Sequence, residues 1–219
     1  MGTVRIAAFL FTGFIFSITS ASALVPILPA DGQLNFTVLR DGDEIGSHRI
    51  SFSQQGEQLK IAINTDITVK LPFVGIEVYR FVHQGEETWR NNRLVALDSK
   101  TNDDGTDHVL AVMVSDDQLL ITGDGEKSTA RANIIPASLW HRDIVAGGTI
   151  LNTLTGRQME VSISDLGADD ITAYGQPVKV HHYSITGELQ REVWYDSKGV
   201  LMQVKFKADD GSDVVYVLK

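Results

Sequence analysis

Apolar and polar residues alternate along almost the whole chain from Gln33 to Lys219, with the two-residue period that is typical of β-strands. Leu34, Phe36 and Val38 begin the pattern, and short turns rich in Asp, Asn and Gly interrupt it. Connections such as Ala208–Ser212 are too short for the crossovers that join parallel strands. The sequence therefore predicts an all-β fold, a single antiparallel meander of about a dozen strands.

A sheet of that many strands is expected to curve, because strand twist accumulates across it and each apolar face must be covered. We predict a barrel or half-barrel. Only residues 134–145 lack the alternation, and Pro136 stands where the first turn of a helix accepts proline. This favours one short helical turn near residues 136–145, against the mouth or the inner face. Without a linker or repeat, residues 24–219 are predicted to form one domain.

The first 23 residues have the three parts of a secretory signal peptide. Arg5 supplies the early cation, Ile6–Ile18 is apolar, and Ala21-Ser-Ala23 is a typical cleavage site. The apolar run is shorter than the roughly 20 residues of a membrane span, although an uncleaved N-terminal anchor remains the alternative. We predict export to the periplasm and no membrane span after cleavage. A lipid anchor is excluded because the chain has no cysteine.

The mature chain is acidic. Loss of Arg5 leaves 18 Lys and Arg against 28 Asp and Glu, a net charge of −10. Such a surface repels nucleic acid and gives no electrostatic attraction to anionic membranes. The absence of cysteine also excludes thiolate chemistry and means that the core alone stabilises the fold.

Histidines and acidic turns are the candidate metal ligands of this chain. The six histidines are His48, His83, His108, His141, His181 and His182. They show no metal-binding spacing, and neighbours on a strand point to opposite faces. The sequence therefore predicts no metal and no cofactor, although His48, His83 and His108 on adjacent strands remain a possible assembly. Turns such as 102–107 lack the ligand positions of calcium loops and are interpreted as hairpin turns.

Ser138, His141 and Asp143 are the residue types of a hydrolytic triad, and they are close in sequence. Nothing resembling a nucleophile elbow surrounds Ser138, however. A simpler interpretation is that Ser138 and Asp143 cap a short helix while Trp140 packs beneath it. We therefore predict no catalytic residue.

Aromatic residues on the predicted strands are the candidate ligand-binding residues. They are Tyr79, Phe81, Trp89, Trp140, Tyr183 and Trp194. A curved sheet with aromatic side chains on its inner face is able to hold an apolar ligand. The alternative is that these side chains simply fill the core, as large aromatic residues usually do. In either case the three tryptophans are predicted to be buried.

Several segments carry a resemblance to exported proteobacterial proteins that are grouped only as a domain of unknown function. The segments are Val38–His48, Val78–His83, Glu87–Trp89, Leu94–Gly105, Pro136–Trp140, His182–Gly187 and Glu192–Asp196. The resemblance covers Gln33–Lys219 and implies no activity or site residue. The expected layout is also similar, more remotely, to half-barrel periplasmic carriers of lipid and lipoprotein, although those carriers use a larger helical plug.

Two functional hypotheses follow. The first is a periplasmic binding or carrier module for an apolar or amphipathic ligand, and the acidic exterior favours a neutral or cationic one. The second is a structural or accessory envelope protein that docks another protein through its β-sheet, with no small-molecule ligand. An enzyme is a third hypothesis, for which the sequence offers no catalytic motif.

Overall fold

The computed structural model describes residues 28–29, 31–71 and 73–219. The predicted signal peptide lies outside the described residues. The first eight strands are β1 (Gln33–Arg40), β2 (Asp43–Gln55), β3 (Gln58–Lys70), β4 (Glu77–Arg90), β5 (Arg93–Asp103), β6 (Thr106–Ser115), β7 (Gln118–Gly123) and β8 (Glu126–Arg131). They are followed by β9 (Ile135–Pro136), the 3₁₀ helix η1 (Arg142–Ala146), β10 (Gly148–Leu151), β11 (Gln158–Ala173), β12 (Gln176–Gly187), β13 (Arg191–Tyr195), β14 (Leu201–Lys207) and β15 (Asp213–Leu218).

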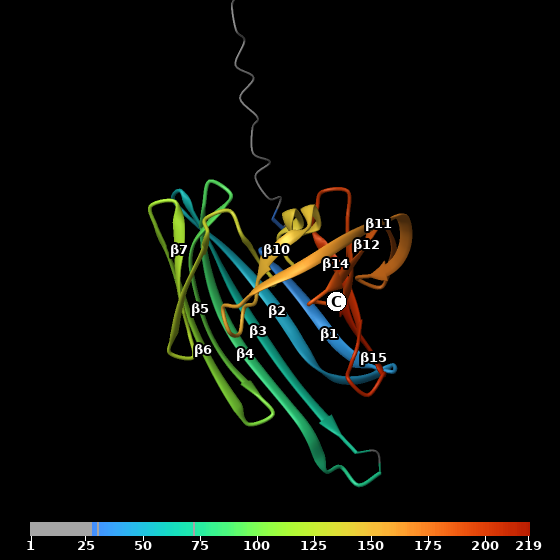
Figure 1. Ribbon diagram of the computed structural model, residues 1–219. Coiled ribbons are helices and arrows are strands. Elements are labelled where there is room, and N and C mark those ends of the chain that lie inside the picture. Colours follow the sequence, from blue (N-terminus) through green and yellow to red (C-terminus); the bar gives the residue numbers. More distant parts are fainter. Residues whose placement is uncertain (1–27, 30, 72) are drawn as a thin grey trace, which may run out of the picture.

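All 15 strands belong to one curved sheet, and the first strand of the chain, β1, is the central strand of that sheet (Figure 1). The order is β8-β7-β6-β5-β4-β3-β2-β1-β15-β14-β13-β12-β11-β10-β9, so the first and last strands are neighbours, with Phe36 opposite Leu218. Every pair is antiparallel except the short β9–β10 pair. The all-β antiparallel meander is confirmed. The sheet is an open, curved one and does not close into a barrel.

Two-residue turns join many of the strands, as the sequence predicts. Asp41 and Gly42, Asn91 and Asn92, and Asp104 and Gly105 all have positive φ angles, between 48° and 95°. Turns with two positive φ angles match the right-handed twist of the strands, and Asn, Asp and Gly adopt them most easily. The local sequence therefore explains where the strands beside these turns end.

The core lies on the inner face of the curved sheet. In β3, for example, Ile61, Ile63, Thr65, Ile67 and Val69 are buried while most residues between them are partly or fully exposed. Most of the buried apolar residues form one large cluster, which includes the predicted core tryptophans. A second, smaller cluster of Val38, Ile67, Val69 and Val214 lies farther along the strands.

The predicted helical turn is present, but it is shorter than the irregular segment that suggested it. It begins at Arg142, and the side chain of His141 caps it by accepting a hydrogen bond from the Asp143 amide. Pro136 lies instead in β9, where it is opposite Leu151 at the edge of the sheet. Proline is tolerated at an edge because that strand needs few ladder hydrogen bonds. None of the helical structure within the described residues is long and apolar enough to cross a membrane.

Candidate functional site

The two ends of the sheet approach each other near the turn between β10 and β11. Ser99 Oγ on β5 donates a hydrogen bond to the carbonyl of Thr153 at 2.6 Å, and Gln158 Nε2 on β11 donates to the carbonyl of Thr129 on β8 at 3.2 Å. Gly123 on β7 makes this approach possible, because a Cβ there would collide with the carbonyl oxygen of Thr155. The curved sheet is thus held nearly closed at this end.

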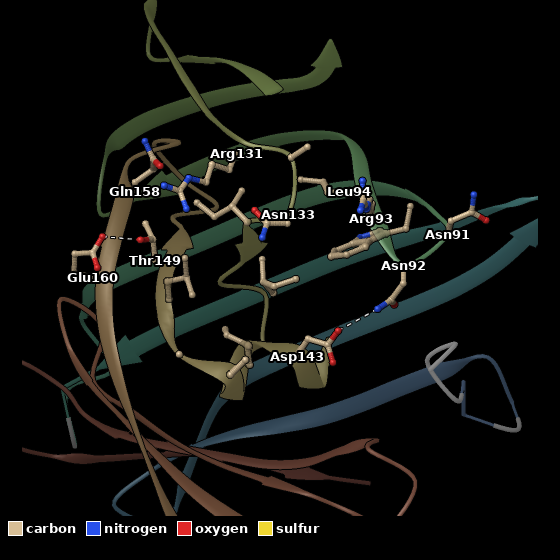
Figure 2. Close-up of a pocket in the computed structure, with 18 residues that line it drawn as sticks. Asn91, Asn92, Arg93, Leu94, Arg131, Asn133, Asp143, Thr149, Gln158 and Glu160 are labelled. Atoms are coloured by element: carbon tan, nitrogen blue, oxygen red, sulfur yellow. Dashed lines mark hydrogen bonds between the residues drawn. The ribbon is translucent and has the colours of Figure 1, made fainter. Parts of the chain in front are cut away.

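A cleft of about 780 Å³ opens beside this contact (Figure 2). Its walls come from the β4–β5 turn, the segment after β8, the helix η1, and strands β10 and β11. Buried apolar side chains form its inner surface, namely Trp89, Leu94, Ile134, Ile144 and Ile150. Exposed polar side chains surround them, among them Asn91, Asn133, Thr149 and Gln158. The cleft is therefore amphipathic.

The charges around the cleft are balanced. Arg93 and Arg131 contribute two cations, and Asp143 and Glu160 contribute two carboxylates. Thr149 Oγ1 donates a hydrogen bond to Glu160 Oε1 at 2.7 Å, which fixes one of these carboxylates on the β10–β11 wall (Figure 2). Although the whole chain carries −9, the immediate lining of the cleft has no net charge.

A buried carboxyl group lies behind the cleft. Glu87 is only 1 % exposed, and its Oε2 accepts hydrogen bonds from the indole nitrogens of Trp89 at 2.7 Å and Trp140 at 2.9 Å. Burial raises the pKa of Glu87, while hydrogen bonding to the two indoles and to Ser138 acts in the opposite direction. One carboxylate oxygen therefore joins the strand tryptophan to the tryptophan that precedes the helix.

The other oxygen of Glu87 is less well satisfied. Ser138 is close enough to influence the Glu87 carboxyl, yet Ser138 Oγ and Glu87 Oε1 are both buried and neither has a hydrogen bond of acceptable geometry. In the described residues no hydrogen bond joins Ser138 to His141, so the residue types of a triad are not arranged as one. His141, and not Ser138, caps the helix.

His141 connects this buried group to the cleft. It is 3 % exposed and stacks on Trp89 with ring centres 4.6 Å apart. Its Nδ1 accepts from the Asp143 amide at 3.2 Å, so Nε2 carries the proton and donates to Asn92 Oδ1 at 2.8 Å. Asn92 Nδ2 in turn donates to Asp143 Oδ2 at 3.1 Å. Burial lowers the pKa of His141, which favours the neutral imidazole over the charged form, while Asp143 opposes the shift.

The six aromatic candidates do not form one site. Trp89 and Trp140 pack edge to face, 5.3 Å apart, and Trp89 alone of the six lines the cleft. Tyr79 and Phe81 pack against the smaller core cluster, far along β4 from the cleft. Their separation follows from the length of β4, on which Phe81 and Trp89 are eight residues apart.

The remaining two aromatic candidates lie on the C-terminal strands β12 and β13. Trp194 stacks on His182 with ring centres 4.0 Å apart and donates its indole N–H to Asp169 at 2.9 Å. Tyr183 packs near Tyr195 and accepts a hydrogen bond from Arg142 at 3.2 Å. All three tryptophans are buried as predicted, at 2–5 % exposure.

Three histidines share one row across the sheet. His48 on β2 is opposite Thr65, which is opposite His83 on β4, followed by Thr101 and His108. The histidines thus occupy alternate strands with threonines between them. His48 and His83 contact Thr65 and Thr101, each pair 2.7 Å apart. No group of three metal-ligating side chains is close enough to hold an ion within the part of the chain described.

Sequence patterns gave little indication of the residues that form the cleft or of Glu87 behind it. A signal for Glu87 exists in the sequence, because a carboxyl at an inward position between Gly85 and Trp89 breaks the apolar pattern. Asn92, Arg93 and Arg131 belong to turns and strand ends, where polar residues are expected for other reasons. Only their spatial convergence identifies them.

The fold and the cleft define an all-β protein with one open, curved antiparallel sheet. Residues 36–219 match the family described as Domain of unknown function (DUF6134), and the chain belongs to that family. The resemblance to an uncharacterised family is therefore confirmed. No curated protein matches the chain.

Proposed function

We propose that this protein is an exported binding module whose cleft takes a small amphipathic molecule with a neutral or zwitterionic polar end. The cleft itself is the observation that carries the proposal. Its volume of about 780 Å³ is in the range of small-molecule sites, and its buried apolar surface is surrounded by polar groups. An apolar tail would lie over Leu94, Ile134 and Ile150, with the polar end at the rim.

The balance of charges at the rim supports this choice of polar end. Arg131 on β8 and Glu160 on β11 present opposite charges from two walls of the same cleft. A zwitterion is able to pair with both, whereas an anion is opposed by Asp143, Glu160 and the acidic exterior. A cationic amphiphile is repelled by the two arginines of the cleft, although the acidic exterior of the protein attracts it.

The wall formed by the β4–β5 turn is pre-organised. Asn92 is held by both His141 and Asp143, and Trp89 is fixed by its hydrogen bond to Glu87 and by stacking on His141. Side chains that are already ordered lose little conformational entropy when a ligand binds. The buried polar network therefore contributes to binding indirectly, by positioning this wall.

Docking of another envelope protein through a strand edge is less well supported. The edge strand β8 has six residues, including Glu126, Lys127 and Arg131, and the opposite edge, β9, has two residues, of which one is Pro136. Short, charged and proline-containing edges are the features with which proteins prevent edge-to-edge pairing. Both edges therefore favour a small-molecule role over strand addition.

Export to the periplasm remains part of this proposal and rests on the sequence of residues 1–23. Intact-mass analysis of the protein from a periplasmic extract measures it directly. We expect a mature chain that begins at Leu24. A chain that still begins at Met1 would contradict the proposal.

The binding experiment compares three single-chain amphiphiles with the same C12 tail, each below its critical micelle concentration. They are dodecylphosphocholine, dodecyltrimethylammonium and laurate, titrated into the mature protein by isothermal calorimetry. We expect dodecylphosphocholine to bind most tightly and laurate most weakly. Arg131→Gln should weaken dodecylphosphocholine about fivefold or more, since it removes one charge-assisted contact. Lys100→Gln, an exposed change on β5, is the matched control and should leave the affinity unchanged. Absence of binding by all three amphiphiles would refute the proposal.

A further inference from the structure

The hairpin formed by β3 and β4 extends beyond the rest of the sheet. Pairing between β2 and β3 ends at Gly46 and Ile67, and pairing between β4 and β5 ends at Phe81 and Asp103. Strands β3 and β4 nevertheless continue to pair as far as Lys70 and Glu77. The last part of this hairpin is therefore a two-stranded ribbon, and it projects from the lower end of the sheet in Figure 1.

The end of this ribbon is apolar and exposed. Leu71 is 45 % exposed, Phe73 108 %, Val74 63 % and Ile76 60 %, and we call these four residues the β3–β4 tip. Glu77 is the only charged residue between Lys70 and Arg80. Exposed apolar groups that adjoin one another are uncommon on soluble proteins and mark surfaces that contact something else.

The backbone of the tip is partly satisfied by its own hydrogen bonds. The Leu71 amide donates to the carbonyl of Ile76 at 2.8 Å, and the Gly75 amide donates to the carbonyl of Leu71 at 3.0 Å. Phe73 has a φ of 67°, a conformation that bulky residues rarely adopt, and its side chain is fully exposed. A loop whose backbone groups pair internally enters an apolar environment at lower cost than an open one.

We propose that the β3–β4 tip inserts into the interfacial region of a lipid bilayer and anchors the protein reversibly at a membrane surface. A specific protein interface takes about 20–30 residues on each side, and four residues at the end of a free ribbon do not provide such a surface. A bilayer, in contrast, accepts a narrow convex projection. The tip carries no cation, and the chain is acidic, so the interaction is apolar and does not need anionic lipid.

This anchoring is independent of the proposed binding function. Strand β4 begins at Glu77, next to the tip, and reaches the cleft at Trp89, so the two sites lie at opposite ends of one 14-residue strand. A protein anchored through the tip would hold its cleft away from that membrane surface, open to solution. Failure of either proposal therefore leaves the other standing.

The test measures flotation of the mature protein with vesicles of phosphatidylcholine alone and of phosphatidylcholine mixed with phosphatidylglycerol. Phe73→Asp removes the most exposed apolar side chain, and Met113→Asp makes the matched change at a 66 % exposed residue on β6. We expect wild-type protein and Met113→Asp to float equally well, and at least as well with phosphatidylcholine alone as with the mixed, anionic vesicles. Phe73→Asp should partition at least about tenfold more weakly, because it loses an apolar group and gains a charge. Its midpoint of urea unfolding should equal that of the wild-type protein.

A second variant reports the depth of insertion. The indole of Phe73→Trp should shift its emission to shorter wavelength with vesicles and be quenched by brominated lipid. Failure of the wild-type protein to float would overturn the proposal. Equal flotation of wild type and Phe73→Asp would also overturn it.

Discussion

Glu87 is expected to stabilise the folded protein by accepting two indole hydrogen bonds in a buried site. In Glu87→Ala both hydrogen bonds are lost, and the indole nitrogens of Trp89 and Trp140, now 2.7 and 2.9 Å from Glu87 Oε2, have no acceptor. A buried donor without a partner costs about 1–3 kcal/mol, so the two together cost about 2–6 kcal/mol. This is a large part of the 5–15 kcal/mol by which domains are typically stable.

Glu87→Gln separates hydrogen bonding from charge. Its amide oxygen is able to accept from both indoles, and its amide nitrogen would stand where Oε1 is now, beside the buried hydroxyl of Ser138. We therefore expect the free energy of unfolding at pH 7 to remain within about 1 kcal/mol of the wild-type value or to exceed it.

The pH dependence has a defined sign. Burial raises the pKa of Glu87 in the folded protein above its ordinary value of 4.5. The stability that this residue contributes is therefore complete below pH 4.5 and is lost as the pH rises through the folded pKa. Wild-type protein should lose stability relative to Glu87→Gln across that range.

The assay is urea unfolding of the chain from Leu24 to Lys219, followed by tryptophan fluorescence between pH 4 and 8. A loss of less than about 1 kcal/mol in Glu87→Ala would refute the assigned role of the carboxyl. Equal losses in the alanine and glutamine variants would refute the distinction between hydrogen bonding and charge.

Three further predictions concern stability and are measured in the same assay. Burial lowers the pKa of His83 to about 4, so the stability that neutral His83 contributes is present above pH 6.5 and is lost as the pH falls toward 4, by about 3 kcal/mol at most. His83→Asn should weaken this dependence of the free energy of unfolding on pH, and an unchanged dependence would contradict the prediction. Gly123→Ala places a Cβ against the backbone of Thr155 and should cost about 1–3 kcal/mol or more, whereas the Cβ of Gly85→Ala meets side chains, nearest the Nε2 of His83 at 3.0 Å, and should cost less. Trp194→Ala should cost about 3–5 kcal/mol, because the ring is buried, and an unchanged midpoint would show that it does not contribute to the core.

Strands and turns were predictable because their causes are local. Alternation sets the buried face of each strand, and pairs such as Asp41-Gly42 and Asp104-Gly105 adopt the positive φ angles of two-residue turns. The short connections also identified the sheet as antiparallel. The pairing of β15 with β1 was not predictable in this way, because residues such as Phe36 and Leu218 are neighbours in the sheet but lie far apart in the sequence.

The cleft depends on such long-range contacts throughout. Its lining combines residues from 89–94, 131–135, 143–150 and 158–160, which meet only because the ends of the sheet approach each other near Gly123. The aromatic pattern indicated that the three tryptophans are buried, but it did not indicate which aromatic residue lines the cleft. Trp89, Phe81 and Trp194 look alike in the sequence, yet the structure places them in three separate environments.

The most direct test of the proposed cleft uses the indole N–H signals of the three tryptophans in a ¹H–¹⁵N spectrum of the mature protein. Trp89 lines the cleft, whereas Trp194 is buried beside His182 and outside the cleft lining. Titration with dodecylphosphocholine below its critical micelle concentration should shift the Trp89 signal in a saturable manner and leave the Trp194 signal in place. No saturable shift of Trp89, or a shift of Trp194 alone, would contradict a ligand site in this cleft.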